Sequence, residues 1–526
     1  MNALVVLFAA NLSDEAVQPL IGDSNSLLLA FERSRLFPGA AKTVVLAGPG
    51  DYSFPPASCI EKRDLWTLKD MLETIAAHSA GFDLTYFAWA DCPFLDPALA
   101  GRLAERHIRY AAEYSYADGW PYGLAPELLS PGTAAILAKI LGESDGGPVG
   151  RDALFSVIQK DINAFDIETE ISPVDLRCHR LSLCANSKRN LLLLRRIIDC
   201  NTGEIPDTAA VERIIAENPA ILRTLPAFYP IQVYGGCPQS CAFCPWPQRA
   251  GEAVTSRRDF MEAAQFESLL EKIRAFSGDA VIDLSLWGEL SLHPQKMELI
   301  EMVLRRPELA LVIESSGIGW QESELEQSAE LAKKAATTAR KNALPPLSWI
   351  VSLDTADPTR YAEIRGAGFA EAQACARKLF SLFPKDTYVQ AVRTAGAEDD
   401  IERFYRSWKE AASGAAPGAA PNIANIIIQK YDDFCGMLPR KQASDLSPVQ
   451  RQPCWHLMRD MPVLIDGTVP LCREQICSNS RITGNAFTDP LDVIWEKGQG
   501  LYIEQAVSKK YDSLCAECDE YYTYNF

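Results

Sequence analysis

The chain has 526 residues, more than one ordinary domain holds, so we expect about two to four domains. Hydrophobic residues make up 48% of the chain and charged residues 23%, a balance that supports large cores and excludes global disorder. The net charge of −18 argues against broad affinity for nucleic acid or anionic lipid, because clustered Lys and Arg bind both.

The opening run Ala3–Ala10 is short and apolar and follows no basic segment, which predicts a buried strand rather than a signal peptide. No apolar run approaches the roughly 20 residues of a membrane span. The chain has 15 cysteines, and most of those from Cys237 onward have metal-like spacings, which indicates a reducing compartment. We therefore expect a cytoplasmic protein without nucleic-acid or membrane partners.

Residues 1–185 are expected to form a first domain in which strands and helices alternate. This alternation predicts a doubly wound, mostly parallel sheet with helices on both faces, and ligands bind beyond the carboxyl ends of such strands. Asp91 lies at such an end. The expected strands are Ala3–Ala10, Thr43–Leu46 and Leu84–Trp89, and the expected helices are Ser26–Arg35, Leu65–His78 and Pro97–Glu113.

The stretch Ala90–Leu95 resembles the nucleotidyltransferase-like fold of sugar-nucleotide and cofactor-guanylyl transferases, where a strand ends in Asp followed by Pro-Phe-Leu. In that family a Gly-rich loop follows the first strand. Here the loop Ala9–Glu15 has no glycine and no basic residue, and its acids would repel phosphate. The resemblance therefore implies a degenerate domain that binds a nucleotide, a sugar or a protein, or only supports its neighbour. Tyr114–Gly123 is predicted to be a pocket-lining loop or a packed cluster of turns.

A helical linker is expected over residues 186–227, and a second α/β alternation over 228–445. Six strands within about 200 residues predict a partial (β/α)6 barrel, whose site lies at the carboxyl ends of the strands. The expected strands are Pro230–Tyr234, Ala280–Trp287, Ala310–Glu314, Trp349–Leu353, Tyr388–Arg393 and Asn425–Gln429.

The first barrel strand leads into Cys237, Cys241 and Cys244, three thiols within eight positions. A tetrahedral zinc site needs a fourth ligand, and none is evident nearby. A [4Fe–4S] cluster held by three thiolates keeps one iron open, and an open iron can bind a small chelating ligand. The spacing therefore favours a cluster with an open corner over a closed structural metal site.

This loop and the strand ends that follow it resemble the radical SAM family. Phe243 precedes the last cysteine as in that family, and Trp287-Gly288-Glu289 is similar to its Gly-Gly-Glu motif, with Trp in place of the first glycine. The resemblance implies that Glu289 receives the amino group of S-adenosylmethionine (SAM) and that Arg393 pairs with its carboxylate, as a planar guanidinium can. The other SAM or substrate contacts that it implies are Phe243, Gly288, Ser315, Ser352 and Asp354.

The resemblance also implies the chemistry. The amino and carboxylate groups of SAM chelate the open iron, and one electron cleaves SAM to a 5′-deoxyadenosyl radical that takes a hydrogen atom from substrate. The cofactor supplies this reactivity, and the barrel orients it and excludes water. A flavodoxin or ferredoxin-type protein is the implied reductant.

Residues 446–526 are expected to form a small Cys-rich α+β domain. Cys454 and Cys472 flank an expected hairpin with an Asp466-Gly467 turn, and Cys515 and Cys518 form a knuckle. Four thiolates complete a closed site, and spacing alone does not choose between a cluster and zinc. Cys477 is either a buried free thiol or a substitute ligand.

This layout resembles the SPASM/twitch extension of radical SAM enzymes, which holds auxiliary [4Fe–4S] clusters. Its four-cysteine form implies one auxiliary cluster, with zinc as the alternative. Together the three regions resemble the spiro-SPASM group. We therefore expect a radical SAM enzyme that acts on a peptide or protein. The alternatives are dehydrogenation or other modification of a carbohydrate or nucleotide-linked molecule, an active nucleotidyltransferase, and a non-catalytic iron–sulfur protein.

Overall fold

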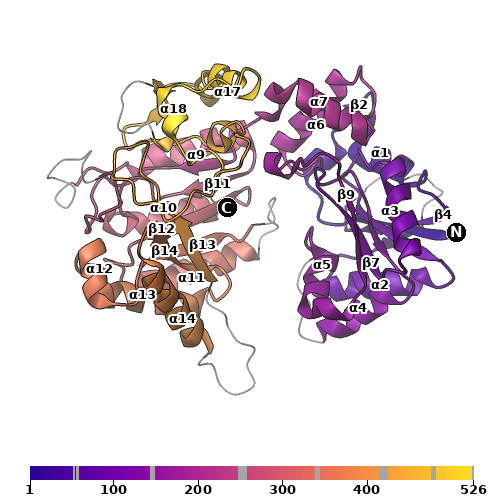
Figure 1. Ribbon diagram of the computed structural model, residues 1–526, viewed down its shortest axis with the longest axis horizontal. Helices are drawn as coiled ribbons and strands as arrows, with labels where there is room; N and C mark the ends of the chain where they lie inside the picture. Colours follow the sequence, from indigo (N-terminus) through magenta and orange to yellow (C-terminus); the bar gives the residue numbers. More distant parts are fainter. Residues whose placement is uncertain are drawn as a thin grey trace. The chain divides into compact units, whose positions relative to one another are not determined.

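The structure is a computed structural model that describes residues 1–50, 54, 59–142, 149–246, 258–337, 344–413, 425–474 and 481–523. Cys477 lies outside these residues. The chain forms two compact units, Met1–Thr224 and Leu225–Phe526, drawn in Figure 1. Among the described helices, none combines the length and the apolar composition needed to cross a bilayer.

The N-terminal unit is built on a seven-stranded sheet in the order β5-β4-β1-β6-β8-β7-β9. All neighbours in it are parallel except β8, which runs antiparallel to β6 and β7. The expected α/β fold with a mostly parallel sheet is therefore confirmed. The strands are β1 Ala3–Ala9, β4 Ala40–Ala47, β5 Cys59–Lys62, β6 Leu84–Trp89, β7 Tyr114–Asp118, β8 Glu127–Leu129 and β9 Ile167–Ile171.

The helices of this unit pack on the sheet and on one another (Figure 1): α2 contacts α4, α4 contacts α5, and α3 lies on β7 and β9. The prediction of a loop at Tyr114–Gly123 was wrong for its first half, because β7 pairs with β9 there. Two helices of the expected linker, α6 and α7, belong to the same compact unit. The bounds are α1 Ser26–Ser34, α2 Leu68–Ser79, α3 Pro97–Arg109, α4 Thr133–Leu141, α5 Ala153–Ile158, α6 Lys188–Cys200 and α7 Thr208–Glu217.

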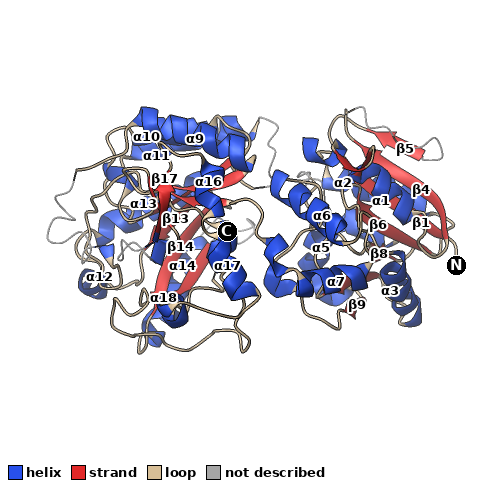
Figure 2. Ribbon diagram, turned by 90° about the horizontal axis from the view of Figure 1, so that it is seen from above, coloured by secondary structure: helices blue, strands red, loops and turns tan. Residues whose placement is uncertain are grey.

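The second unit contains a six-stranded sheet in sequence order, β10 to β15, with every neighbour parallel. This is the predicted partial barrel. Helices α9, α10, α11 and α13 follow one another along the outside, each in contact with the next (Figure 2). The elements are β10 Phe228–Pro230, α9 Ala263–Ser277, β11 Ala280–Asp283, α10 Lys296–Leu304, β12 Leu309–Ser315, α11 Glu322–Ala336, β13 Leu347–Ser352, α12 Pro358–Ile364, α13 Phe369–Leu382, β14 Thr387–Arg393, α14 Glu398–Ser413 and β15 Asn425–Lys430.

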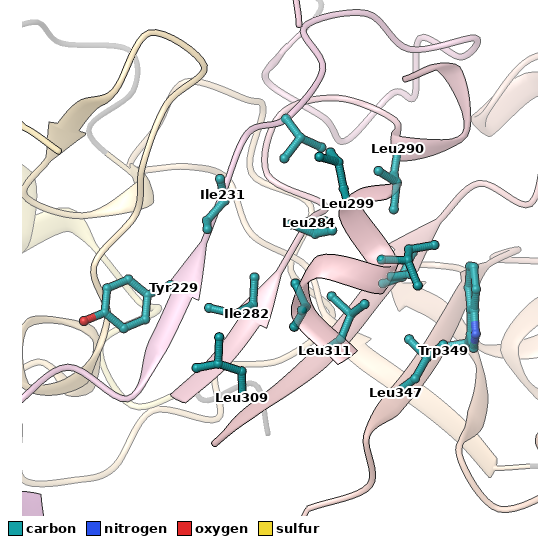
Figure 3. Packing of buried hydrophobic residues seen from close by; sticks show 14 of the residues in the cluster. Tyr229, Ile231, Ile282, Leu284, Leu290, Leu299, Leu309, Leu311, Leu347 and Trp349 are labelled. Atoms are coloured by element: carbon teal, nitrogen blue, oxygen red, sulfur yellow. The ribbon is translucent and has the colours of Figure 1, made fainter. Parts of the chain in front are cut away.

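Alternation along these strands separates an outer face from an inner one, because successive side chains of a strand point to opposite sides. Ile282, Leu311 and Trp349 lie in the large core between the sheet and its helices (Figure 3). The residues of the other parity, such as Val312 and Ile350, form a small apolar cluster inside the barrel. Inward positions nearer the strand ends are polar, and they face the functional cavity.

The C-terminal segment begins beside the first barrel strand. Val463 forms a parallel bridge with Ile231, and Lys272 on α9 donates to three backbone carbonyls at residues 486–489. The expected turn is present, with Gly467 at φ +83° and a 2.8 Å hydrogen bond across it from Leu464 N to Thr468 O, and β16 also pairs with β17. The elements are α15 Trp455–Arg459, β16 Thr468–Pro470, β17 Ile482–Asn485, α16 Leu491–Glu496, α17 Gln499–Ala506 and α18 Ser513–Glu517.

Candidate functional site

A cavity of about 250 Å³ opens at the carboxyl ends of the barrel strands. The three-cysteine loop forms one wall of it, and the carboxyl ends of β11 to β15 with the residues that follow some of them form much of the rest. Lining residues from the sequence predictions are Cys237, Cys241, Phe243, Cys244, Gly288, Glu289, Ser315 and Ser352. Further lining residues include Asp283, Glu314, Arg365, Gln390, Lys430, Asp432, Phe434 and Arg473.

The cysteine loop is held by backbone hydrogen bonds from both sides. Cys244 N donates to Cys241 O over 3.1 Å, which closes a turn, and Ala242 N donates to Ile364 O over 2.9 Å. Burial raises the pKa of the Cys237 thiol, and it raises the pKa of Cys244 to about 12. Among the described lining residues, the only sulfur donors are these three cysteines. Three converging thiols without a fourth suit a cluster with one open iron, so the donor set fits the implied group.

Gly288 allows its own backbone to approach that of Tyr234, which lies just before the cysteine loop. A Cβ at Gly288 would lie 2.8 Å from the carbonyl carbon of Tyr234 and nearer still to its oxygen. The preceding Trp287 adopts φ +48°, the left-handed conformation that glycine takes at low cost. Trp287 is held there by a ring stack on Trp246 at 6.4 Å and by a 2.8 Å hydrogen bond from Gln232 Nε2 to its carbonyl. The tryptophan therefore keeps the turn that the family builds with glycine.

Glu289 is buried and well held. Ser315 Oγ donates to its Oε1 over 2.8 Å, and Ser316 N donates to its Oε2 over 2.7 Å. Burial raises the pKa of Glu289, an effect that these hydrogen bonds oppose. The carboxylate is thus fixed on the cavity wall, ready to accept a hydrogen bond from a cationic group.

Arg365, to which the sequence assigned no role, joins the cysteine loop to the residues after β13. Its Nη1 donates to Asp354 Oδ2 over 2.5 Å, and its Nε donates to Gln239 Oε1 over 3.0 Å. Its guanidinium lies 5.9 Å from the ring centre of Phe243. Asp354 also accepts a hydrogen bond from Val392 N at 2.8 Å. Asp354 therefore fixes Arg365 and the end of β14, and it is not among the described lining residues.

A row of polar side chains crosses the inner face at the strand ends. Ser352 Oγ and Gln390 Nε2 both donate to Glu314 Oε1, over 2.8 and 2.7 Å. Ser285 N donates to Asp283 Oδ1 over 3.0 Å. Strand alternation could have predicted this row from the sequence. Each of its residues lies two positions after an inward-facing apolar residue of the same strand, so its side chain points to the same side.

Arg393 does not join the row. It shares the parity of Val389 and Ala391, which belong to the outer core, and Val392 lines the cavity instead. The side chain of Arg393 is 41% exposed and pairs with Glu398 at 3.7 Å. Its assignment to the SAM carboxylate rested on proximity to the strand end and neglected the strand's alternation.

The raised pKa of Asp283 predicts that the stability of the folded chain depends on pH. Burial, reinforced by the Glu314 carboxylate and opposed by Ser285 and Arg473, raises the pKa of Asp283 to about 7. A raised pKa means that the folded chain holds this proton where the unfolded chain has lost it, so stability falls as pH rises from about 4 to 7. We expect Asp283→Asn to increase the free energy of unfolding at pH 8 and to change it little at pH 4, measured by urea denaturation.

Asp489→Asn is the matched control, because hydrogen bonds from Asn485 and Thr488 lower the pKa of Asp489. A carboxylate whose pKa is lower in the folded chain than in the unfolded chain stabilises the fold at pH values above its unfolded pKa. This variant should therefore lose stability at pH 8 rather than gain it. A gain for Asp283→Asn that is as large at pH 4 as at pH 8 would contradict the assignment of the proton to Asp283.

The four expected C-terminal thiols lie in one region of the second unit. Cys454 and Cys472 each interact electrostatically with both Cys515 and Cys518. Sequence analysis missed Arg451, whose guanidinium stacks between two tyrosine rings at 4.3 and 4.4 Å and donates to the carbonyls of Cys515 and Cys518. Arg451 therefore holds the backbone of the knuckle, and four thiols are the number of donors that a closed tetrathiolate site needs.

Asp91 is a fully buried acid of the N-terminal unit. Both of its oxygens accept hydrogen bonds from Arg151, at 2.7 and 2.5 Å, and the guanidinium lies 4.0 Å from the ring centre of Trp89. Its carboxylate charge is thus neutralised within the protein. The thiols of Cys92 and Cys184 lie beside it, 3.1 Å apart.

Replacement of Arg151 by Ala is expected to destabilise the N-terminal unit by about 3–5 kcal/mol, because it leaves a buried carboxylate without its partner. Hydrogen exchange of β1 and β6 peptides in urea reports on this unit separately. Arg177→Ala is the control, since Arg177 pairs with Asp175 at the surface and such pairs contribute about 0–1 kcal/mol. Equal effects of the two variants would show that the buried pair contributes no more than a surface pair.

The Radical SAM superfamily model matches residues 231–392. An uncharacterized protein of Treponema pallidum (strain Nichols) is 35% identical over 380 residues, which cover 71% of this chain and 98% of the relative. SuiB of Streptococcus suis, bound to its precursor peptide SuiA, is 14% identical with a TM-score of 0.42, covering 70% of this chain and 84% of SuiB. BtrN in complex with AdoMet and 2-DOIA is 17% identical with a TM-score of 0.35, covering 56% of this chain and 93% of BtrN.

Proposed function

The chain belongs to the radical SAM superfamily, and on that basis we propose that its barrel cleaves SAM reductively and directs the product radical to a hydrogen atom of a bound peptide or protein. The observation that carries the proposal is one cavity that is lined by three thiols without a fourth, by Gly288 and by a buried Glu289. When bound, the [4Fe–4S] cluster supplies the electron and the open iron that this chemistry requires.

The chain's own residues would do the positioning. Cys237, Cys241 and Cys244 would hold three corners of the cluster. Glu289 is fixed by Ser315 and by Ser316 N, and it would accept a hydrogen bond from the SAM amino group. Because this carboxylate is already held in place, it would orient SAM without rearranging. The Arg365–Gln239 hydrogen bond would keep the cysteine loop in place while SAM binds.

The C-terminal thiols would hold a second [4Fe–4S] cluster, with zinc as the alternative. The support is four thiols in one region of the second unit, two of them on a knuckle whose carbonyls accept hydrogen bonds from Arg451. Anaerobic reconstitution with iron and sulfide should then give about eight irons per chain, and zinc in the C-terminal site would leave about four. A flavodoxin or ferredoxin-type protein would supply the electron.

A peptide or protein substrate leads because the chain resembles the SPASM/twitch group, in which this is the commonest use. A carbohydrate or nucleotide-linked substrate is the second candidate. The row formed by Asp283, Glu314 and Gln390 favours it, since carboxylates and amides pair well with hydroxyl groups.

Deuterium transfer separates the two. Peptides and sugar nucleotides deuterated at carbon would each be incubated with reconstituted protein, SAM and reductant, and 5′-deoxyadenosine would be analysed by mass spectrometry. Deuterium from a peptide alone supports the first candidate, and deuterium from a sugar nucleotide alone supports the second. No 5′-deoxyadenosine from any mixture would reject the proposed reaction.

A further inference from the structure

Two cysteines and an aspartate meet just after the carboxyl end of β6, in the N-terminal unit. The Sγ atoms of Cys92 and Cys184 lie 3.1 Å apart, although 92 positions separate the two residues in the sequence. Asp91 completes the group, and one ligand atom from each of the three residues lies within 4.8 Å of the others. Each residue is at most 2% exposed. The fold therefore brings two sulfur donors and one oxygen donor together in its interior.

Backbone contacts hold Cys184 against this strand end. Ala185 N donates to the backbone carbonyl of Asp91 over 2.8 Å, which fixes the neighbouring Cys184 beside Cys92. Gly123 packs against the same segment, and a Cβ there would lie 2.9 Å from the backbone oxygen before Cys184 and 3.3 Å from Cys184 Sγ. The position of this thiol is thus set by the backbone on two sides, so the two sulfurs meet without a rearrangement of the fold.

A divalent cation would leave this buried group without net charge. Two thiolates and the Asp91 carboxylate carry three negative charges, and a divalent ion together with the Arg151 guanidinium carries three positive ones. Arg151 donates one hydrogen bond to each oxygen of Asp91, and a carboxylate has about four acceptor positions, so positions remain for a metal. Carboxylates that bind metals are commonly held by such outer hydrogen bonds. Arg151 would therefore orient Asp91 as a ligand.

The donor set selects zinc among the common divalent ions. Magnesium and calcium prefer oxygen ligands, whereas zinc binds cysteine sulfur together with carboxylate oxygen. Two thiolates on one tetrahedral zinc, with Zn–S bonds of about 2.3 Å, lie about 3.8 Å apart, so the observed 3.1 Å would widen by about 0.7 Å. Three protein donors leave the fourth position of the tetrahedron for water or another small ligand.

We propose that Asp91, Cys92 and Cys184 bind a zinc ion that ties the segment around Cys184 to the end of β6. The two thiols lose their protons to solvent on binding, and no electron is transferred. Because the donors are buried, zinc enters while the unit opens or folds, and its binding stabilises the folded unit. All three ligands belong to the N-terminal unit, so the proposal does not depend on the chemistry of the barrel.

The first test measures zinc in the full-length chain, produced with added zinc, purified without oxygen and reconstituted with iron. Cys92→Ser and Cys184→Ser should each hold about one zinc ion per chain fewer than the unchanged protein. Any zinc at the C-terminal thiols is common to all three proteins and cancels in this difference. Cys200→Ser is the matched control, because Cys200 is a thiol of α6 in the same unit, and it should retain the zinc.

Hydrogen exchange tests the site without a substitution. A ligand that binds only the folded unit at about 100 times its dissociation constant shifts unfolding about 100-fold. In the unchanged protein, β6 peptides should therefore exchange about 100-fold more slowly in urea with that concentration of zinc than without zinc. The two serine variants should exchange equally with and without zinc.

Three results would overturn the proposal. The first is zinc that leaves the exchange of β6 unchanged in the unchanged protein. The second is a Cys92→Ser or Cys184→Ser protein that holds as much zinc as the unchanged chain. The third is recovery of Cys92 and Cys184 as a disulfide from protein purified without oxygen, because a disulfide has no thiolate to offer a metal.

Discussion

Replacement of Cys237, Cys241 or Cys244 by Ala is expected to lower 5′-deoxyadenosine formation by more than about 100-fold, because loss of an outer-shell partner of a metal ligand already costs 10–100-fold and these are the ligands themselves. Each variant leaves two thiols for a group that needs three. The measurement is the rate of SAM cleavage by anaerobically reconstituted protein with a chemical reductant.

Cys178→Ser provides the control, because this thiol is exposed in the N-terminal unit. Its rate should equal that of the unchanged protein. Iron content would be determined in parallel, and each barrel variant should retain the iron that is bound by the C-terminal thiols. SAM cleavage at an undiminished rate in any of the three variants would place the reactive cluster elsewhere.

Gly288→Ala is expected to have the second large effect. The added Cβ would collide with the backbone carbonyl of Tyr234, and backbone cannot move aside as a flexible side chain can. Overpacking costs about 1–3 kcal/mol, and this site should reach or pass the upper end. Because Glu289 is the next residue, its carboxylate should shift as well, and SAM affinity should fall. Urea denaturation and equilibrium binding of SAM measure the two effects.

Gly500→Ala is the matched control within the same unit. Gly500 lies in α17 with open space around it, so Ala should stabilise this helix by about 0.5–1 kcal/mol. SAM binding should be unchanged in that variant. A Gly288→Ala protein with unchanged unfolding and unchanged SAM affinity would show that the strand ends do not approach as closely as we describe.

Much of the fold could be predicted from local patterns. Apolar runs such as Leu84–Trp89 form strands with the bounds expected, since burial on both faces leaves a continuous signal. The part that failed depended on distant partners. Tyr114–Asp118 has turn-forming neighbours, yet it forms β7, because pairing with β8 and β9 outweighs local preference.

The same contrast between local patterns and distant partners applies to the candidate site. Closely spaced motifs, the cysteine loop and Gly288-Glu289, were visible because the chemistry constrains neighbouring positions. The role of Arg365 was not, since Arg365 reaches Gln239 in the cysteine loop only through the fold. The misplacement of Arg393 was avoidable, because alternation along β14 assigns it to the outer face and Gln390 to the inner one.

The most direct test of the central assignment is SAM cleavage by the unchanged full-length protein. Reconstituted without oxygen and reduced in the presence of SAM, it should form 5′-deoxyadenosine and methionine in equal amounts. Omission of iron or of reductant should abolish both products. Protein that carries its full complement of iron and yet leaves SAM intact under these conditions would contradict the account.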